Sequence, residues 1–183
     1  ARLVSDYGGC PLAKREYRPF HALTSAIISQ QLSAKAADTI KRRVSQIVPS
    51  PFRPDCYLAA RTSALRNAGL SQAKARYIRE LAERVSDGRL SFDNLKSEND
   101  EAVISALIEL PGIGRWTAEM FLIFGLKRPD VLSLNDAGLQ RAAKMLYCAT
   151  KGGNISLERI GKNWAPHRSV ASWYLWKHLD TVR

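Results

Sequence analysis

The groups best suited to chemistry lie between Leu110 and Asp136, in the stretch LPGIGRWTAEMFLIFGLKRPDVLSLND. An apolar run with helical spacing ends at Pro111, and Gly112 and Gly114 then let the backbone turn sharply through positive φ. The amides of the glycines and of the next helix's first turn have no acceptor within that helix, and the helix dipole adds partial positive charge. A phosphate can approach such amides closely, although a plain turn between helices fits the same pattern.

Asp136 is the second candidate for chemistry, because it stands at the start of an expected helix, directly after Asn135. Aspartate is common there as a helix cap. The amides and the dipole at a helix start also favour an ionised carboxylate, which can stabilise positive charge or deprotonate a water. The residues alone leave a cap and a catalyst both open, and Asp130 is the nearest rival carboxylate.

The charge balance favours a polyanionic partner. The 183 residues include 28 Lys and Arg against 17 Asp and Glu, a formal net charge of +11, which suits nucleic acid better than an anionic membrane. No apolar run approaches the length of a membrane span, and no secretory signal is visible. The cysteines at positions 10, 56 and 148 are far apart and form no CxxC pair. This spacing disfavours a metal site or a disulfide framework and fits a reducing intracellular setting.

The elements that must position these residues are all expected to be helices, since no run alternates convincingly at period two. The predicted helices cover about residues 20–29, 33–48, 54–60, 62–67, 72–86, 99–110, 115–126, 137–146, 156–163 and 166–179. Residues 90–97 are expected to form a loop, residues 126–134 an extended segment and residues 151–154 a turn. The helix from residue 115 is apolar nearly all round, which predicts that it is buried.

Four blocks of the sequence resemble one known family. LPGIGRWTA, followed about twenty residues later by Asp136, resembles the hairpin of the helix-hairpin-helix DNA glycosylases. IISQQLSAKAADTI (27–40), GLSQAKARYIRELAE (69–83) and WAPHRSVASWYLW (164–176) resemble blocks of its alkylpurine branch, the 3-methyladenine DNA glycosylase II type. The blocks occur in the family's order over most of the chain.

The resemblance implies an all-α fold of two helical lobes with a cleft between them. The middle lobe, with the hairpin, is expected over about residues 35–133. The N-terminal segment together with about residues 134–183 is expected to form the second lobe.

The resemblance also implies that Asp136 is catalytic in a DNA glycosylase of base excision repair that flips and excises alkylated purines such as 3-methyladenine and 7-methylguanine. Breaking an N-glycosidic bond builds positive charge on the sugar, and a fixed carboxylate beside it lowers the barrier. Two alternatives stay open: a glycosylase for another damaged base (uracil, hypoxanthine or ethenoadenine), and a non-catalytic helix-hairpin-helix DNA-binding module.

Trp116 stands where bifunctional members of the superfamily have a lysine that attacks the sugar. An indole cannot form a Schiff base. The resemblance therefore implies a monofunctional hydrolase without lyase activity. The four cysteines of the iron–sulfur branch are also missing near the C-terminus.

Aromatic residues are expected to form the base pocket. Trp116 and Trp176 occupy positions where the alkylpurine branch lines its site, and Met120 would share the wall one turn beyond Trp116. An indole face attracts a cationic methylated purine by about 0.5–2 kcal/mol. Trp164 and Trp173 are assigned to core packing. The sequence leaves three roles open for His167: a pocket wall, a phosphate contact or plain surface.

The remaining predicted contacts concern the duplex. Gln31 is the expected wedge that fills the gap left by the flipped base, although a polar break between helices is the simpler explanation of Gln30-Gln31. Predicted phosphate contacts are Gly112, Gly114, Arg115, Thr117, Ser71 and Lys74. The family's hairpin carbonyls commonly bind a monovalent cation, which would make Leu110 and Ile113 backbone ligands.

The expected partner is double-stranded DNA containing damaged bases, bound by a monomer, with no membrane contact. No cofactor is expected to be required, and the hairpin cation that the resemblance suggests would be structural only. The expected compartment is intracellular, either cytoplasm and nucleoid or nucleus.

Overall fold

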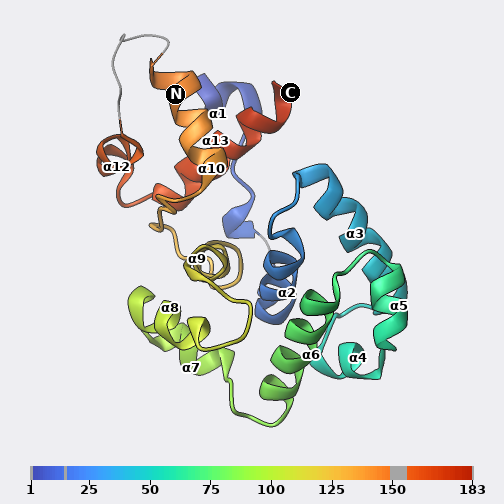
Figure 1. Ribbon diagram of the computed structural model, residues 1–183. Coiled ribbons are helices and arrows are strands. Elements are labelled where there is room, and N and C mark those ends of the chain that lie inside the picture. The colour runs from blue at the N-terminus through green and yellow to red at the C-terminus, as the bar shows by residue number, and fades with distance from the viewer. Residues whose placement is uncertain (1, 15, 149–155, 183) are drawn as a thin grey trace. The chain divides into compact units, whose positions relative to one another are not determined.

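The computed structural model describes residues 2–14, 16–148 and 156–182, and within these ranges the chain forms helices and loops without a β-strand (Figure 1). The all-α expectation is confirmed. The turn expected over residues 151–154 lies outside the described residues. Among those described, every helix is too short or too polar to cross a membrane.

Contacts divide the chain into two compact units. The hairpin unit is Arg18–Leu126, and the terminal unit combines Ala1–Tyr17 with Lys127–Arg183. The lobe boundaries expected near residues 35 and 133 stay a prediction.

The hairpin unit contains eight of the labelled helices. They are α2 (Pro19–Ser29), α3 (Ala34–Ile47), α4 (Pro54–Ala59), α5 (Thr62–Asn67), α6 (Gln72–Ser86), α7 (Phe92–Ser97), α8 (Asp100–Ile108) and α9 (Arg115–Phe124). The described elements of the terminal unit are α1 (Arg2–Tyr7), η1 (Leu12–Lys14), α10 (Ala137–Ala143), η2 (Lys144–Cys148), α12 (Leu157–Gly161), η3 (Lys162–Trp164) and α13 (Arg168–Thr181).

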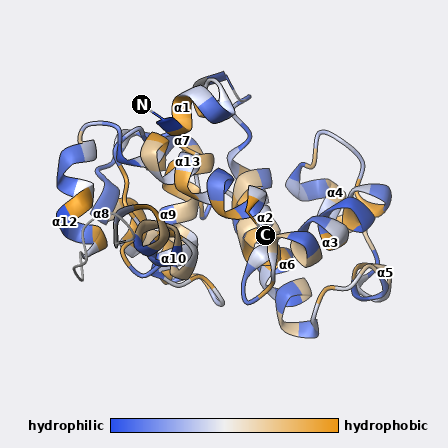
Figure 2. Cartoon of the chain, turned by 90° about the horizontal axis from the view of Figure 1, so that it is seen from above, coloured by the Kyte–Doolittle hydropathy of each residue, from blue (hydrophilic) through white to orange (hydrophobic). Residues whose placement is uncertain are grey.

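Helix α9 is the central element of the hairpin unit. Every residue from Thr117 to Ile123 is buried, which confirms the prediction from its apolar sequence. It packs against α2 and α8. By contrast, α3 buries only Ala37 and Val44, and Figure 2 shows hydrophilic colours along much of its length.

Helix starts follow the capping rules. The side chains of Ser33, Ser71, Asn99 and Asp136 each accept a hydrogen bond from the amide three residues ahead, as local capping chemistry predicts. These caps were readable from sequence because donor and acceptor belong to the same turn.

Two sequence expectations about the helices are wrong. Residues 92–97 form the helix α7 rather than a loop, because Ser91 caps the amide of Asn94 and Leu95 is buried. A helix of six residues is too short to display a clear hydrophobic period. The last helix begins at Arg168, after Pro166, and not with Pro166 in its first turn.

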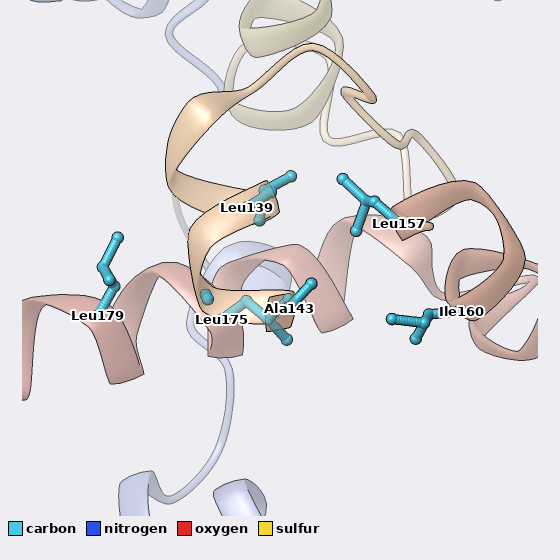
Figure 3. Packing of buried hydrophobic residues seen from close by; sticks show 7 residues of the cluster. Leu139, Ala143, Leu157, Ile160, Leu175 and Leu179 are labelled. Atoms are coloured by element: carbon cyan, nitrogen blue, oxygen red, sulfur yellow. The ribbon is translucent and has the colours of Figure 1, made fainter. Parts of the chain in front are cut away.

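The core of the terminal unit is one cluster of buried aliphatic side chains, most of them drawn and labelled in Figure 3. Its members are Leu139, Ala142, Ala143, Leu157, Ile160, Leu175 and Leu179. They come from α10, α12 and α13. Trp164 and Trp176 pack against this cluster, so the burial of apolar surface holds α13 beside α10.

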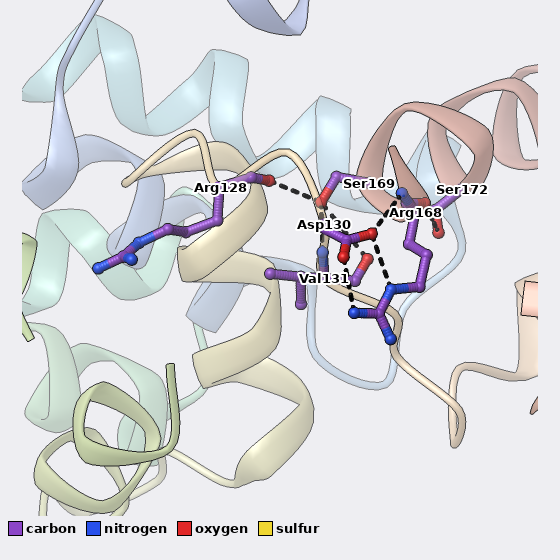
Figure 4. A network of polar contacts seen from close by, with 6 residues as sticks. All are labelled: Arg128, Asp130, Val131, Arg168, Ser169 and Ser172. Carbon is purple, nitrogen blue, oxygen red and sulfur yellow. Dashed lines mark hydrogen bonds and ion pairs between the residues drawn. The ribbon is translucent and has the colours of Figure 1, made fainter. Parts of the chain in front are cut away.

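A polar clamp fixes the start of α13 (Figure 4). The Arg168 guanidinium donates two hydrogen bonds of 2.8 Å to the Asp130 carboxylate, and the Arg168 amide donates a third to Asp130 Oδ1. The Ser169 hydroxyl donates to the Arg128 carbonyl and accepts from the Val131 amide. Asp130, the rival carboxylate in the sequence, therefore caps α13 from the connecting segment.

The clamp predicts a pH-dependent stability. The hydrogen-bonded Arg168 guanidinium lowers the pKa of the Asp130 carboxyl below its usual value, so the clamp stabilises the fold above the unfolded pKa and is lost as the pH falls through the folded pKa. Because both side chains are partly exposed, Asp130→Asn should cost about 0.5–1 kcal/mol at pH 7 after solvent screening. Urea unfolding at several pH values measures this cost, which should begin to fall near pH 4, the ordinary pKa of an aspartate, and vanish only below the lower pKa of the folded state.

Asp6→Asn is the matched control, since Asp6 pairs with Arg2 only loosely, at 3.9 Å on the exposed surface. It should leave the free energy of unfolding nearly unchanged. A pH-independent cost of Asp130→Asn would contradict the clamp.

Candidate functional site

Asp136 is the N-cap of α10, and its Oδ1 atom accepts two hydrogen bonds. The Leu139 amide donates at 2.7 Å and the Trp176 indole Nε1 donates at 3.0 Å. The residue is only 7% exposed. Two donors and the positive end of α10 stabilise negative charge on this side chain and fix its orientation.

Gly138 leaves the space that this arrangement needs. A Cβ atom at this position would lie 3.0 Å from Asp136 Oδ1 and 3.4 Å from Trp176 Cδ1. Sequence reasoning missed Gly138. The available signal was a glycine inside a helix, where it costs about 1 kcal/mol relative to alanine and so asks for a packing reason.

The predicted base-pocket residues fall into two sets. Trp176, half-buried on α13, belongs to the terminal unit with Asp136 and contacts it directly. Trp116 and Met120 lie one turn apart on α9 in the hairpin unit, where Trp116 is half-buried and Met120 is buried. His167, the N-cap of α13, is exposed and makes no side-chain cap.

The hairpin glycines differ from each other. Gly112 has φ +78°, and a Cβ atom there would lie 2.0 Å from the Tyr77 ring, so both backbone and packing require glycine. Gly114 has φ −99°, and a Cβ atom there would meet nothing within 4 Å. The expectation of positive φ is therefore wrong for Gly114. As the N-cap of α9, Gly114 has no side chain to cap the first-turn amides.

Gln30 ties the hairpin to the end of α2. Its Nε2 atom donates to the Gly112 carbonyl at 2.7 Å and to the Thr117 hydroxyl at 2.9 Å. Thr117, a predicted phosphate contact, is 2% exposed and uses its hydroxyl in this bond. Sequence reasoning treated Gln30 only as part of a helix break, because its partners lie more than 80 residues away.

Gln31, the predicted wedge, is exposed and has φ +56°. Such a left-handed conformation is uncommon for a residue other than glycine. The adjacent Leu32 is also exposed, at 39%. Lys74, a predicted phosphate contact, donates from Nζ to the Ile28 and Gln30 carbonyls, and burial lowers the pKa of its ammonium.

The other predicted phosphate contacts have partners within the protein. The Ser71 hydroxyl caps α6 through the Lys74 amide at 3.2 Å. Arg115 pairs with the carboxylates of Glu101 and Glu119, and the hydrogen bond to Glu101 raises the pKa of its guanidinium. Its side chain stays 49% exposed, so part of the guanidinium faces solvent.

The predicted cation ligands belong to a tight turn, in which the Leu110 carbonyl accepts from the Ile113 amide at 3.1 Å. Their role stays a prediction. Over the described ranges, no cluster of three or more His, Cys, Asp or Glu side chains could hold a metal ion.

Comparison with known proteins connects this geometry to one family. The pattern of the HhH-GPD superfamily base excision DNA repair proteins matches residues 24–167. A solved DNA-3-methyladenine glycosidase from Bacillus halodurans is 40% identical, with a TM-score of 0.73 over 98% of this chain and 88% of the other. The Schizosaccharomyces pombe 3-methyladenine DNA glycosylase Mag1, solved with abasic DNA, is 30% identical with a TM-score of 0.75, over 96% of this chain and 88% of the other.

Some relatives are longer than this chain. The Bacillus subtilis protein YfjP is 32% identical over 97% of the chain, which spans 64% of the length of YfjP.

The two hairpin glycines give a matched pair of stability predictions. Gly112→Ala should destabilise the protein by about 2–4 kcal/mol, because it adds backbone strain and a clash with the Tyr77 ring. Gly114→Ala should change stability by no more than about 0.5 kcal/mol, since φ and the surrounding space both accept a methyl group. Thermal unfolding of the two variants beside the wild type measures the difference. Equal melting temperatures would contradict the described turn.

Proposed function

Because the chain belongs to the HhH-GPD superfamily of base excision DNA repair proteins, we propose that it is a glycosylase that flips alkylated purines out of duplex DNA and hydrolyses their N-glycosidic bond. The observation that carries the proposal is the Asp136 carboxylate, held by the Leu139 amide and the Trp176 indole. The names of the similar solved proteins support 3-methyladenine as a substrate.

Asp136 would act on the sugar rather than on the base. As the bond between the base and C1′ lengthens, positive charge develops on the deoxyribose, and a carboxylate already held in place stabilises that charge without reorganising. The same carboxylate can orient or deprotonate the water that attacks C1′. In this proposal Trp176 positions the carboxylate through its indole N–H, and its predicted place in the base pocket stays a prediction.

Base recognition is assigned to Trp116 and Met120 on α9. Purines methylated at N3 or N7 carry a positive charge, which the face of an indole attracts and which a neutral, undamaged purine lacks. The thioether of Met120, one turn further along the same face, adds a polarisable apolar surface.

DNA binding is assigned to the hairpin and to Gln31. The start of α9 lacks a side-chain cap at Gly114, and the open space beside that residue suits a phosphate. Gln31 projects from the loop after α2 and would fill the gap left by the flipped base. The net charge of +11 supports a salt-sensitive attraction to the DNA backbone. The proposed enzyme acts as a monomer on cellular DNA, in cytoplasm and nucleoid or in the nucleus.

Asp136→Asn tests the catalytic role. Asparagine keeps the shape and an oxygen acceptor for Leu139 and Trp176 but removes the charge. Release of methylpurines from methylated duplex DNA should fall by a factor of about 100 or more, because a preorganised charge is lost. Binding of the same duplex, measured by fluorescence anisotropy, should stay within about threefold, since the phosphate contacts are unchanged. Undiminished base release by Asp136→Asn would contradict this role.

A second prediction concerns the strand. Because Trp116 cannot form a Schiff base, the DNA strand should stay intact after base release and break only on alkali treatment. Gel electrophoresis of an end-labelled duplex, with and without alkali, measures this. Borohydride added during the reaction should trap no covalent complex. Cleavage without alkali, accompanied by a trapped adduct, would exclude the monofunctional assignment.

A further inference from the structure

The loop that carries Gln31 is anchored at the C-terminal end of α2 by an ammonium group. Lys74 Nζ donates to the Ile28 carbonyl at 2.8 Å and to the Gln30 carbonyl at 2.7 Å. Carbonyls at the end of a helix lack intrahelical donors and form the negative end of its dipole. A lysine from α6 therefore supplies the charge and the donors that the last turn of α2 needs.

The side chain of Gln30 is also held, by acceptors in the hairpin and at the start of α9. Its amide donates to the Gly112 carbonyl in the hairpin and to the Thr117 hydroxyl in the first turn of α9. Gln30 is thus held by Lys74 at its carbonyl and by the hairpin at its side chain. All of these residues belong to the hairpin unit.

Gln31 follows this doubly held residue in a left-handed conformation, φ +56°, with an exposed side chain. A residue other than glycine persists there only when its surroundings impose the conformation. The preceding residue, Gln30, has φ −52° and ψ 133°, and it is held in place by the Lys74 ammonium and the hairpin acceptors. Two of the three donors of Lys74 are used in this way, which leaves it poorly suited to binding a phosphate.

We infer that Lys74, acting through Gln30, is a positioning residue that holds Gln31 in its projecting conformation for insertion into the duplex. The inference rests on the proposed function, because only an enzyme that flips a base needs a wedge. It assigns to Lys74 a role in base flipping and not in phosphate binding.

The test measures wedge insertion without requiring catalysis. A duplex carries a tetrahydrofuran abasic site opposite 2-aminopurine, whose fluorescence reports the stacking of the base facing the gap. Saturating wild-type protein should change this fluorescence, and Gln31→Ala should abolish the change. Lys74→Met keeps the apolar stem and loses the donors. It should reduce the fluorescence change at saturating protein by about fivefold, because Gln31 would then leave its left-handed conformation in most molecules.

Two further variants control the experiment. Lys74→Arg retains donors for the two carbonyls and should restore most of the amplitude. Lys35→Met removes the same charge from an exposed position on α3 and should leave the amplitude unchanged. Should Lys74→Met unfold, Gln30→Met offers a second break in the same chain of bonds and should give the same loss.

The possible outcomes separate the hypotheses. Lys74→Met could keep the full fluorescence change but bind DNA more weakly, with about one fewer ion released on binding. That result would make Lys74 a phosphate contact and overturn the inference. A wild-type protein that changes no fluorescence would also overturn it. Base release from methylated duplex DNA is measured in parallel. Release without a wedge signal leaves the proposed function standing, whereas a wedge signal without release supports the inference and rejects alkylated purines as the substrate.

Discussion

The terminal unit is organised around the pair of hydrogen bonds that the Asp136 carboxylate accepts. The Leu139 amide donates because it lies in the first turn of α10, which Asp136 caps, and the Trp176 indole donates because α13 lies beside α10. The aliphatic cluster between these helices holds them together, and the clamp between Asp130 and Arg168 fixes where α13 begins. Burial of apolar surface supplies most of the favourable free energy of folding. In this unit it also sets the geometry of the Asp136 carboxylate, because it holds together the two helices that carry the donors.

The hairpin unit follows a similar plan with different groups. Helix α9 is buried nearly all round, so its uncapped first turn and the preceding glycine hairpin are held on a rigid support. Gln30 connects that hairpin to the end of α2, and Gln31 projects from the same loop. The groups proposed to bind phosphate and to enter the duplex are therefore set by a few bonds within one unit. Catalysis depends on such preorganisation, because small displacements of the reacting groups cost large factors in rate.

Local chemistry explains which features the sequence could predict. The caps at Ser71 and Asn99 and the buried α9 follow from patterns within one or two turns, so they were predictable. The hydrogen bonds of Gln30 and Lys74 were not predictable. Their partners lie 82 and 44 residues away, and the sequence around a polar side chain does not indicate a distant acceptor. Gly138 was missed for the same reason: the indole that crowds it comes from α13. The candidate catalytic role of Asp136 came from the family resemblance, because its position at a helix start is already explained by a cap.

The central claim is that a fixed carboxylate at Asp136 recognises positive charge on the sugar. The most direct measurement compares two duplexes, one with a pyrrolidine whose protonated nitrogen stands near the C1′ position and one with a neutral tetrahydrofuran. Binding of both is measured by anisotropy. The wild type should bind the cationic duplex about tenfold or more tightly, as complementarity to a charged transition state requires, and Asp136→Asn should lose that preference. Equal affinity of the wild type for both duplexes, or a preference that survives in Asp136→Asn, would contradict the claim.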